Sequence, residues 1–419
     1  MEGLKGACIF GQSGGPTSVI NASAAGVFKE AMRHRCITEI YGLAYGIQGV
    51  LKEEFYDMRK EIPYVLELLK TTPSSALGSI RYKLKDAKDD TDYKRILEVL
   101  KKYNIRYFFY NGGNDSMDTC NKISDYLKQV NYDCRVIGIP KTIDNDIWGT
   151  DHCPGFGSAA KYIATSAMEI YHDTKAYDKG KITVLEIMGR NAGWLTASTA
   201  LASHKGSGPD LIYLPEVEFN ISNFVKETDL LYSKNKNVMV AVSEGIKDKS
   251  GRYIAEYSSD LSGNKDSFGH MQLGGLAPVL VKALKDKTDA PVRYIEFSLL
   301  QRCAAHCASK TDVDEAYFAG QVAVRSAVEG KSGYMIGFER EDGPEYKCSI
   351  KLVDLRDAAN VEKKVPGEWI NKEGNGVNRK FIEYALPLIQ GESYPPTEGG
   401  LPRFAKLNKV PADQTGPKG

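Results

Sequence analysis

The sequence contains no long hydrophobic segment. Among its 419 residues there is no run of about 18 apolar residues, the length that a membrane-spanning helix needs. The first residues, Met-Glu-Gly-Leu-Lys-Gly, have neither the apolar stretch nor the cleavage site of a signal peptide. We therefore expect a protein of the cytoplasm that makes no contact with a membrane.

An excess of charge of one sign is also missing. Lysine and arginine together number 55, aspartate and glutamate 54, and the formal net charge is +1. Proteins that bind nucleic acid usually show a clear basic excess or a basic stripe. We expect no nucleic-acid partner. A phosphate pocket remains compatible with this balance, because it needs only a few focused cations and backbone amides.

Paired cysteines are missing as well. None of the eight cysteines belongs to a CxxC pair. Cys303 and Cys307 flank His306, which resembles the spacing of metal ligands only loosely, and no second pair completes a zinc site. Buried free thiols are the expected state of these cysteines.

Two nucleotide-binding motifs are incomplete. Gly330-Lys331-Ser332 lacks the earlier glycine that a Walker A loop requires. Residues 155–160 fit the pattern G-x-G-x-x-A, but residues 150–154 before them do not form a hydrophobic strand. We therefore expect neither a P-loop nor a nicotinamide site.

Six short apolar runs are each followed by a polar or glycine-rich loop. The runs cover residues 7–10, 107–110, 136–139, 182–187, 211–214 and 238–242. Continuous apolar runs are typical of parallel strands buried on both faces, and helical patterns separate them. This order predicts an α/β fold with doubly wound sheets, and the length favours two domains. Ligands of such sheets bind beyond the carboxyl ends of the strands, where these loops lie.

The loop at residues 13–18 has the composition of an anion site. Gly14 and Gly15 allow the backbone to approach a phosphate closely, and a helix is predicted from about residue 19 to residue 31. The free amides at the start of a helix bind phosphate.

The loop at residues 140–146, Pro-Lys-Thr-Ile-Asp-Asn-Asp, combines a lysine with two carboxylates. Asp144 and Asp146 can share one site, in which one is a general base and the other holds a metal ion or orients its partner. A positioned base contributes about 10²–10⁴-fold to a rate. Lys141 supplies a compact charge suited to phosphate. A turn rich in Asp and Asn explains the same residues equally well, so the loop alone leaves both interpretations open.

Two arginines and a glutamate follow similar glycine-containing segments. Arg81 and Arg190 can each clamp a phosphate through paired hydrogen bonds, and the glycines beside them favour that role over a solvated surface position. Glu244, at a strand end, can accept sugar hydroxyls or cap a helix start. The residues alone do not choose between these two roles.

Taken in order, these segments resemble the phosphofructokinase family. The resemblance covers roughly residues 5–345. Its motifs are Ser-Gly-Gly15, Leu-Gly-Ser-Ile-Arg81, Gly-Gly-Asn-Asp-Ser116, Pro-Lys-Thr-Ile-Asp-Asn-Asp146, Met-Gly-Arg190, Ser-Glu-Gly245 and Gln301-Arg302. It implies two Rossmann-like α/β/α domains with the active site in the cleft between them. The phosphate donor would bind to residues 1–160 plus about 303–345, and a sugar phosphate to about 161–302. Residues from about 346 to 419 would form a C-terminal extension, whose last stretch from residue 409 has the composition of a frayed end.

The resemblance implies transfer of a phosphoryl group to the 1-hydroxyl of fructose 6-phosphate. Asp144 would take the proton from this hydroxyl, with Asp146 beside the transferring group. Gly14, Asn114 and Asp115 would contact the donor, and Arg81 would bridge donor and acceptor. The positions expected to bind the sugar phosphate are Thr142, Ile143, Asp144, Lys181, Met188, Gly189, Arg190, Glu244, Arg293 and Arg302.

Lys181 and Arg293 match family positions that reach the sugar phosphate from a neighbouring subunit. The resemblance therefore implies a homodimer or homotetramer whose active sites are completed across the interface. Lys181 replaces the commoner arginine, and Leu299 stands where the family often has histidine, so one sugar contact is expected to be missing.

Lys141 and Asp115 resemble the members that use pyrophosphate, because ATP-using members have glycine at the first position and usually at the second. A carboxylate at Asp115 would repel the α-phosphate of ATP. Lys141 would neutralise charge on the leaving phosphate. The alternatives are an ATP-dependent 6-phosphofructokinase and a catalytically weak sugar-phosphate-binding regulatory homologue.

Mg²⁺ is the cofactor that the resemblance implies. The family usually has a metal-binding aspartate where this chain has Asn114, which offers a carbonyl oxygen without charge. The candidate metal ligands are therefore Asn114, Asp144 and Asp146, together with the substrate phosphates.

Overall fold

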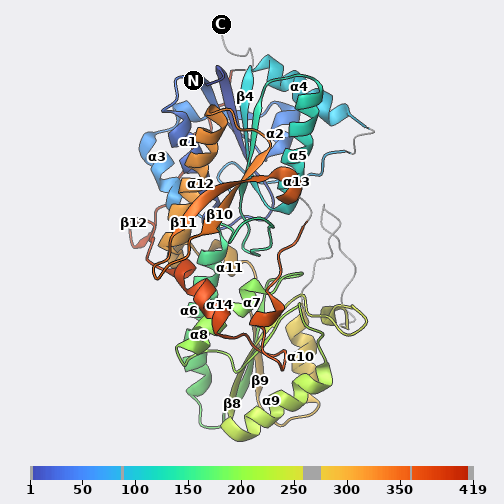
Figure 1. Cartoon of the computed structure of the whole chain (residues 1–419). Coiled ribbons are helices and arrows are strands. Elements are labelled where there is room, and N and C mark those ends of the chain that lie inside the picture. Colours follow the sequence, from blue (N-terminus) through green and yellow to red (C-terminus); the bar gives the residue numbers. More distant parts are fainter. Residues whose placement is uncertain (1–2, 86–88, 258–274, 359–360, 414–419) are drawn as a thin grey trace.

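The structure is a computed structural model that describes residues 3–85, 89–257, 275–358 and 361–413. Two sheets dominate it, one in each half of the molecule (Figure 1). The larger sheet has seven strands in the order β11-β10-β5-β4-β1-β2-β3, and the smaller has four in the order β7-β8-β6-β9. The expected α/β fold with two sheets is confirmed.

The five central strands of the larger sheet are parallel, and an antiparallel strand closes each edge. Its strands are β1 (Gly6–Gln12), β2 (Ile37–Leu43), β3 (Phe55–Asp57), β4 (Ile105–Gly112), β5 (Arg135–Pro140), β10 (Tyr334–Arg340) and β11 (Cys348–Asp354). The smaller sheet is entirely parallel. Its strands are β6 (Lys181–Ile187), β7 (Leu211–Tyr213), β8 (Asn237–Ser243) and β9 (Val292–Glu296). All six apolar runs identified in the sequence are strands.

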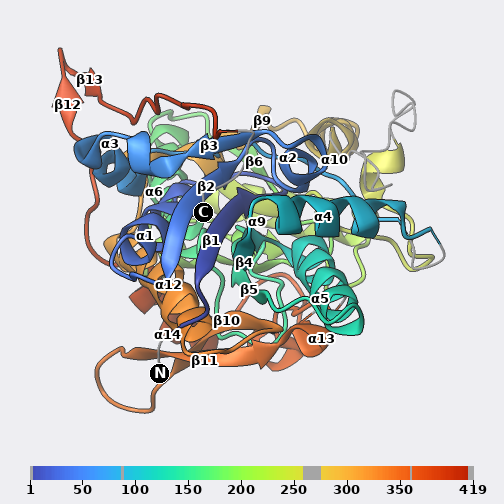
Figure 2. The ribbon, with the colours of Figure 1, turned by 90° about the horizontal axis from the view of Figure 1, so that it is seen from above.

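Helices cover both faces of the larger sheet, as the view from above shows (Figure 2). They are α1 (Ile20–Ala31), α2 (Ile47–Lys52), α3 (Pro63–Leu68), α4 (Thr91–Lys102), α5 (Asn114–Gln129), α12 (Lys310–Val328) and α13 (Leu355–Ala358). Alternate residues of β1 enter different cores: Ala7 and Ile9 pack on one face, Cys8 and Phe10 on the other. This two-sided burial explains why the strand reads as a continuous apolar run.

The smaller sheet is covered in the same way (Figure 1). Its helices are α6 (Phe156–Lys175), α7 (Trp194–Ala197), α8 (Ala200–His204), α9 (Ile221–Asn235), α10 (Leu276–Lys285), α11 (Leu300–Cys303) and α14 (Arg379–Ala385). Along β6, Leu185 and Ile187 enter one core and Ile182 and Val184 the other. This two-sided burial explains the continuous apolar run of β6 as well.

The C-terminal segment contacts both halves of the molecule. β11 extends the larger sheet, whereas Phe381 of α14 lies in a core of the smaller one. A short hairpin of β12 (Thr397–Glu398) and β13 (Leu401–Pro402) follows. The chain then runs along β3, where Val410 O accepts from Asp57 N at 2.9 Å and Ala412 N donates to Phe55 O at 2.9 Å. The expected fraying is therefore wrong for residues 409–413, because these backbone hydrogen bonds hold them; residues 414–419 lie outside the described part.

Candidate active site

A cavity of about 600 Å³ lies where the carboxyl ends of strands from both sheets meet. Its lining includes most of the side chains singled out in the sequence. The lining residues are Gly14, Gly15, Pro16, Arg81, Gly113, Asn114, Asp115, Ser116, Lys141, Thr142, Ile143, Asp144, Asp146, Met188, Arg190, Asn191, Ala192, Glu244, Arg302 and Glu362. A volume of this size is typical of a small-molecule site.

The glycine loop after β1 reaches this cavity because of its backbone conformation. Gly14 has φ of 77°, and a Cβ there would lie 3.0 Å from Lys141 Nζ. Ser13 N donates to Asn111 O at 2.9 Å, and the Ser79 hydroxyl donates to Gly14 O at 2.6 Å. Only glycine combines this φ with room for the lysine head group.

A second anion-binding feature is the start of α5. Gly113 precedes the helix, and its first turn, Asn114–Ser116 by position, lines the cavity. The first amides of a helix have no partner within the helix and carry partial positive charge. Ser116 N donates to Gly113 O at 2.9 Å, so the amides of Asn114 and Asp115 are the ones that can bind a phosphate group in the cavity.

The carboxylate loop, defined here as residues 141–151, is both a turn and part of the cavity wall. Asn145 has φ of 55°, as the turn interpretation requires. The Thr142 hydroxyl donates to Asp144 Oδ2 at 3.3 Å and accepts from Asp144 N at 3.1 Å. Burial raises the pKa of Asp144, and burial together with the charges of Asp144 and Glu362 raises the pKa of Asp146 to about 7. The two interpretations of this loop are compatible.

Lys141 is buried between the carboxylate loop and the glycine loop. Its Nζ donates to Gly15 O at 2.7 Å. Burial lowers the pKa of Lys141 to about 8, against the opposing effect of Asp144 and Asp146. A cation held this way is available to a phosphate without a large rearrangement.

The loop after β6 forms the opposite wall. Gly189 has φ of 137°, its N–H donates to Glu244 Oε1 at 3.3 Å, and the Ser243 hydroxyl donates to Gly189 O. Burial raises the pKa of Glu244 to about 7. A turn follows Glu244, so the helix-capping role is wrong and the carboxylate faces the cavity.

Three arginines complete the positive side of the cavity. Arg81, Arg190 and Arg302 line it from different segments of the chain. Burial lowers the pKa of Arg302, and the nearby charge of Arg81 lowers it further. Like charges this close favour an anion between them.

Three expected site residues do not line the cavity of this chain. Gly189 lies behind Glu244, which its backbone contacts. Lys181 is at the amino end of β6, where its Nζ bonds Asp173 Oδ2 at 2.8 Å. Arg293 is exposed on the edge strand β9, opposite Thr183. The role expected of Lys181 and Arg293 in the site of a neighbouring subunit stays a prediction.

Sequence reasoning missed several lining residues. Most adjoin a motif: Pro16 follows the two glycines of the glycine loop, and Asn191 follows Arg190. Glu362 is different, because Val-Glu-Lys-Lys364 reads as a solvated polar segment. Only the structure shows that the C-terminal segment reaches the cavity, where Glu362 Oε1 accepts from Asn191 Nδ2 at 2.7 Å.

The candidate metal ligands offer oxygen atoms only. Asn114 Nδ2 donates to Asp146 Oδ2 at 3.3 Å, and the buried Asn114 Oδ1 has no hydrogen-bond partner within the described residues. Asp144 lines the same cavity. A set of carboxylate and carbonyl oxygens fits Mg²⁺, which prefers such hard ligands.

The glycine pattern at residues 155–160 has a structural explanation. Gly155 precedes α6, and the carboxylate of Asp312 accepts from Gly155 N at 2.9 Å and from Ser158 N at 2.8 Å. A protein carboxylate thus occupies the start of this helix, where a dinucleotide phosphate would bind. This agrees with the expectation of no nicotinamide site.

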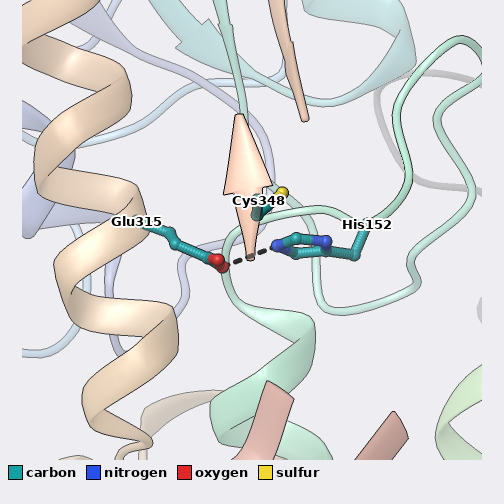
Figure 3. A group of neighbouring side chains, drawn as sticks. All are labelled: His152, Glu315 and Cys348. Carbon is teal, nitrogen blue, oxygen red and sulfur yellow. Dashed lines mark hydrogen bonds and ion pairs between the residues drawn. The ribbon is translucent and has the colours of Figure 1, made fainter. Parts of the chain in front are cut away.

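A separate cluster of His152, Glu315 and Cys348 lies behind the carboxylate loop (Figure 3). His152 bonds Glu315 Oε2 at 2.7 Å and Asp151 Oδ2 at 3.1 Å, and the Tyr346 hydroxyl donates to Glu315 Oε1 at 2.6 Å. Burial works to lower the pKa of His152, but the two carboxylates raise it to about 9. Burial raises the pKa of Cys348 to about 12. A protonated ring and a neutral thiol are poor metal ligands, so this cluster is best described as a buried ion pair.

Comparison with known proteins agrees with the fold and with the family that the motifs resemble. The model of the phosphofructokinase family matches residues 8–288. A relative from Halomonas elongata, named pyrophosphate–fructose 6-phosphate 1-phosphotransferase, is 42% identical over 405 residues, or 96% of each chain. A protein of the same name from Methylococcus capsulatus is 42% identical over 406 residues, again 96% of each chain.

The same holds for solved structures. The pyrophosphate-dependent phosphofructokinase from Marinobacter aquaeolei superposes with a TM-score of 0.88, at 39% identity and over 98% of each chain. The chain belongs to the phosphofructokinase family, as its motifs predicted. None of the helices in the described residues has the length and apolar character needed to cross a membrane.

Proposed function

We propose that this enzyme transfers a phosphoryl group reversibly between pyrophosphate and the 1-hydroxyl of fructose 6-phosphate. The products of the forward direction are fructose 1,6-bisphosphate and phosphate. The observation that carries the proposal is the cavity itself, which combines Lys141, two paired carboxylates and the start of α5 between two sheets. The names of the two relatives that match 96% of the chain support it.

The proposed mechanism is a direct in-line transfer. Asp144 accepts the proton of the sugar 1-hydroxyl, whose oxygen forms a bond to the near phosphorus of pyrophosphate. The bridging P–O bond breaks, and phosphate leaves. Arg81 and Lys141 line the cavity where charge develops, so they can stabilise the oxygens of the leaving group.

The sugar phosphate is proposed to bind to the opposite wall. Met188, Arg190 and Glu244 line this wall, and Arg302 is assigned to the 6-phosphate. Gly189 supports the wall by its hydrogen bond to Glu244, and Thr142 and Ile143 lie at the junction with the carboxylate loop.

Mg²⁺ is the proposed cofactor, held by Asp144, Asp146 and the carbonyl oxygen of Asn114. When bound, it would neutralise charge on the phosphates of the donor. Asp146 then has a second task in the protein itself, since it fixes Asn114 by accepting from its side-chain amide.

The choice of pyrophosphate over ATP is assigned to Asp115 and Lys141. Asp115 is exposed at the cavity wall on the first turn of α5, where a longer donor would extend. Its carboxylate would repel a third phosphate, while Lys141 compensates the charge of the leaving phosphate. ATP use would require both positions to be more permissive.

We also propose a cytoplasmic homodimer or homotetramer, in which Lys181 and Arg293 approach the sugar phosphate of a neighbouring subunit. The exposed position of Arg293 on β9 is compatible with this role. The division into a donor-binding part, 1–160 with about 303–345, and a sugar-binding part, about 161–302, belongs to the same proposal.

The decisive experiment is a coupled assay of the purified protein with fructose 6-phosphate and Mg²⁺. Pyrophosphate and ATP are offered in parallel. Activity with pyrophosphate alone is expected. Activity with ATP alone would overturn the roles given to Asp115 and Lys141, and silence with both would favour a regulatory sugar-phosphate-binding protein.

Donor choice has its own test in the double variant Asp115→Gly with Lys141→Gly. It is expected to gain measurable ATP-linked activity or ATP binding while losing activity with pyrophosphate. Circular dichroism and the melting temperature control for folding, because Lys141 is buried. A folded double variant that neither binds nor uses ATP would show that other residues choose the donor.

A further inference from the structure

The strap, residues 361–365, lies between the two walls of the cavity. On one side its backbone pairs with the carboxylate loop: Lys363 N donates to Asp146 O at 2.7 Å, and Glu362 forms a β-bridge with Ile147. These contacts hold the backbone of the strap beside Asp146, one of the proposed Mg²⁺ ligands. The strap belongs to the C-terminal segment. Lys363 follows Asn145, which it contacts, by 218 residues in the sequence.

The ammonium group of Lys363 serves the same loop. Its Nζ donates to Asp151 O at 2.6 Å and to Thr150 O at 3.2 Å, and lies 3.5 Å from Asn145 Oδ1. Three acceptors match the three N–H bonds of an ammonium group. If Lys363 is replaced, the carbonyl groups of Thr150 and Asp151 lose their charged hydrogen-bond donor inside the protein. The loss of this donor destabilises the folded loop.

The other side of the strap contacts the loop after β6. Trp194 Nε1 donates to Lys363 O at 2.9 Å, and the Lys363 ammonium lies 5.1 Å from the centre of the Trp194 ring. Glu362 accepts from Asn191, as described above. Val365 N and Gly193 N both donate to Glu216 Oε1, at 3.0 Å and 2.8 Å. One short segment therefore touches the loops that carry both walls.

We propose that Lys363 is a positioning residue that fixes the carboxylate loop against the sugar-side loop and so keeps Asp144 in register with the acceptor hydroxyl. This inference rests on the proposed phosphoryl transfer. Displacement of a reacting group by about 1 Å can reduce a rate about 100-fold. Loss of Lys363 should therefore act on turnover more than on substrate binding.

The test compares Lys363→Met, which keeps the length of the side chain without charge or donors, with Lys363→Arg, which keeps both. Lys364→Met is the matched control, because Lys364 is an exposed neighbour in the same strap. We expect Lys363→Met to lower kcat about 10- to 100-fold, with KM for each substrate changed by less than about threefold. Lys363→Arg should recover part of kcat, and the control should match the wild type.

Hydrogen exchange supplies a readout that does not depend on activity. In Lys363→Met the amides of residues 146–153 should exchange faster, while those of α4 stay unchanged. If Lys363→Met does not fold, Lys363→Gln is used for the same measurements, since it keeps a polar donor.

The outcomes separate this inference from the proposed function. A wild type that is inactive with every donor refutes the function, and unchanged exchange in the variant then refutes positioning as well. An active wild type with a variant of normal kcat refutes positioning alone. A variant that only melts earlier, with normal kcat per folded molecule, shows a structural role and also overturns the inference.

Discussion

The two walls of the cavity differ in how completely one chain builds them. The first wall comes from the larger sheet and contains the carboxylate loop, in which Lys141 and Asn145 are buried and Thr142 is hydrogen-bonded to Asp144 of the same chain. The second wall comes from the smaller sheet, whose edge strand β9 exposes four of its five residues. Neither Lys181 nor Arg293 of this chain reaches its own cavity.

This difference indicates that the first wall carries out the chemistry and the second wall mainly binds the substrate. Groups that carry out chemistry gain most from fixed geometry, and the first wall has it. Groups that only bind the substrate can be delivered by another subunit, because binding tolerates more variation. Substitutions in each wall can test this difference.

Removal of the proposed base, Asp144, from the first wall should lower turnover more than any other change. Asp144→Ala is expected to lower kcat by about 10²–10⁴-fold with little change in KM, because a general base acts only in the chemical step. Steady-state kinetics with pyrophosphate measures both constants. Asp286→Ala, at an exposed aspartate that does not line the cavity, is the control. Near-normal turnover in Asp144→Ala would refute the assignment of the base.

The outcome for the fold shows what the sequence could predict. Apolar runs marked β1, β4, β5, β6, β7 and β8 because these strands are buried on both faces or nearly so. β9 escaped this reasoning, because Arg293, Tyr294 and Glu296 interrupt its apolar pattern. β11 has the same character, with mostly half-buried residues at the sheet's edge.

The site residues also fall into two groups, those that the sequence could predict and those that it could not. Residues in glycine-rich and carboxylate-rich loops were predictable, since few structures other than a ligand site need such groups together. The contributions of Glu362 and Lys363 were not, because two charged residues in a polar stretch are ordinarily solvated. Only tertiary contacts, such as that of Lys363 with Asp151 O, identify them.

The first wall should also weaken when the ion pair behind it is broken. His152→Gln leaves the carboxylates of Asp151 and Glu315 without their buried partner, which is expected to lower the free energy of unfolding by about 3–5 kcal/mol near neutral pH. Urea denaturation measures this change. His204→Gln, at an exposed histidine, should change it by less than about 0.5 kcal/mol.

The effect of His152→Gln on stability should depend on pH. Because the pKa of His152 is raised to about 9 in the folded protein, its ionisation stabilises the fold fully below the ordinary value near 6.5. The contribution disappears as the pH rises through about 9. The difference between wild type and His152→Gln should therefore shrink from pH 6 to pH 9, and a difference that grows would contradict the charged state assigned to this ring.

The second wall should show the smallest and most specific effect. Arg293→Met is expected to raise KM for fructose 6-phosphate about tenfold with kcat nearly unchanged, because a cation that holds the substrate phosphate contributes to binding throughout the reaction. Lys285→Met, at an exposed lysine of α10, is the control.

Mixing Arg293→Met with Asp144→Ala tests whether Arg293 acts in the site of its own subunit or in that of a neighbouring subunit. Shared sites would pair an intact Asp144 with an intact Arg293 in some hybrid oligomers, so low-KM activity should appear that neither variant has alone. Activity equal to the sum of the separate variants would mean that Arg293 does not act across an interface, and the second wall would then be as self-contained as the first.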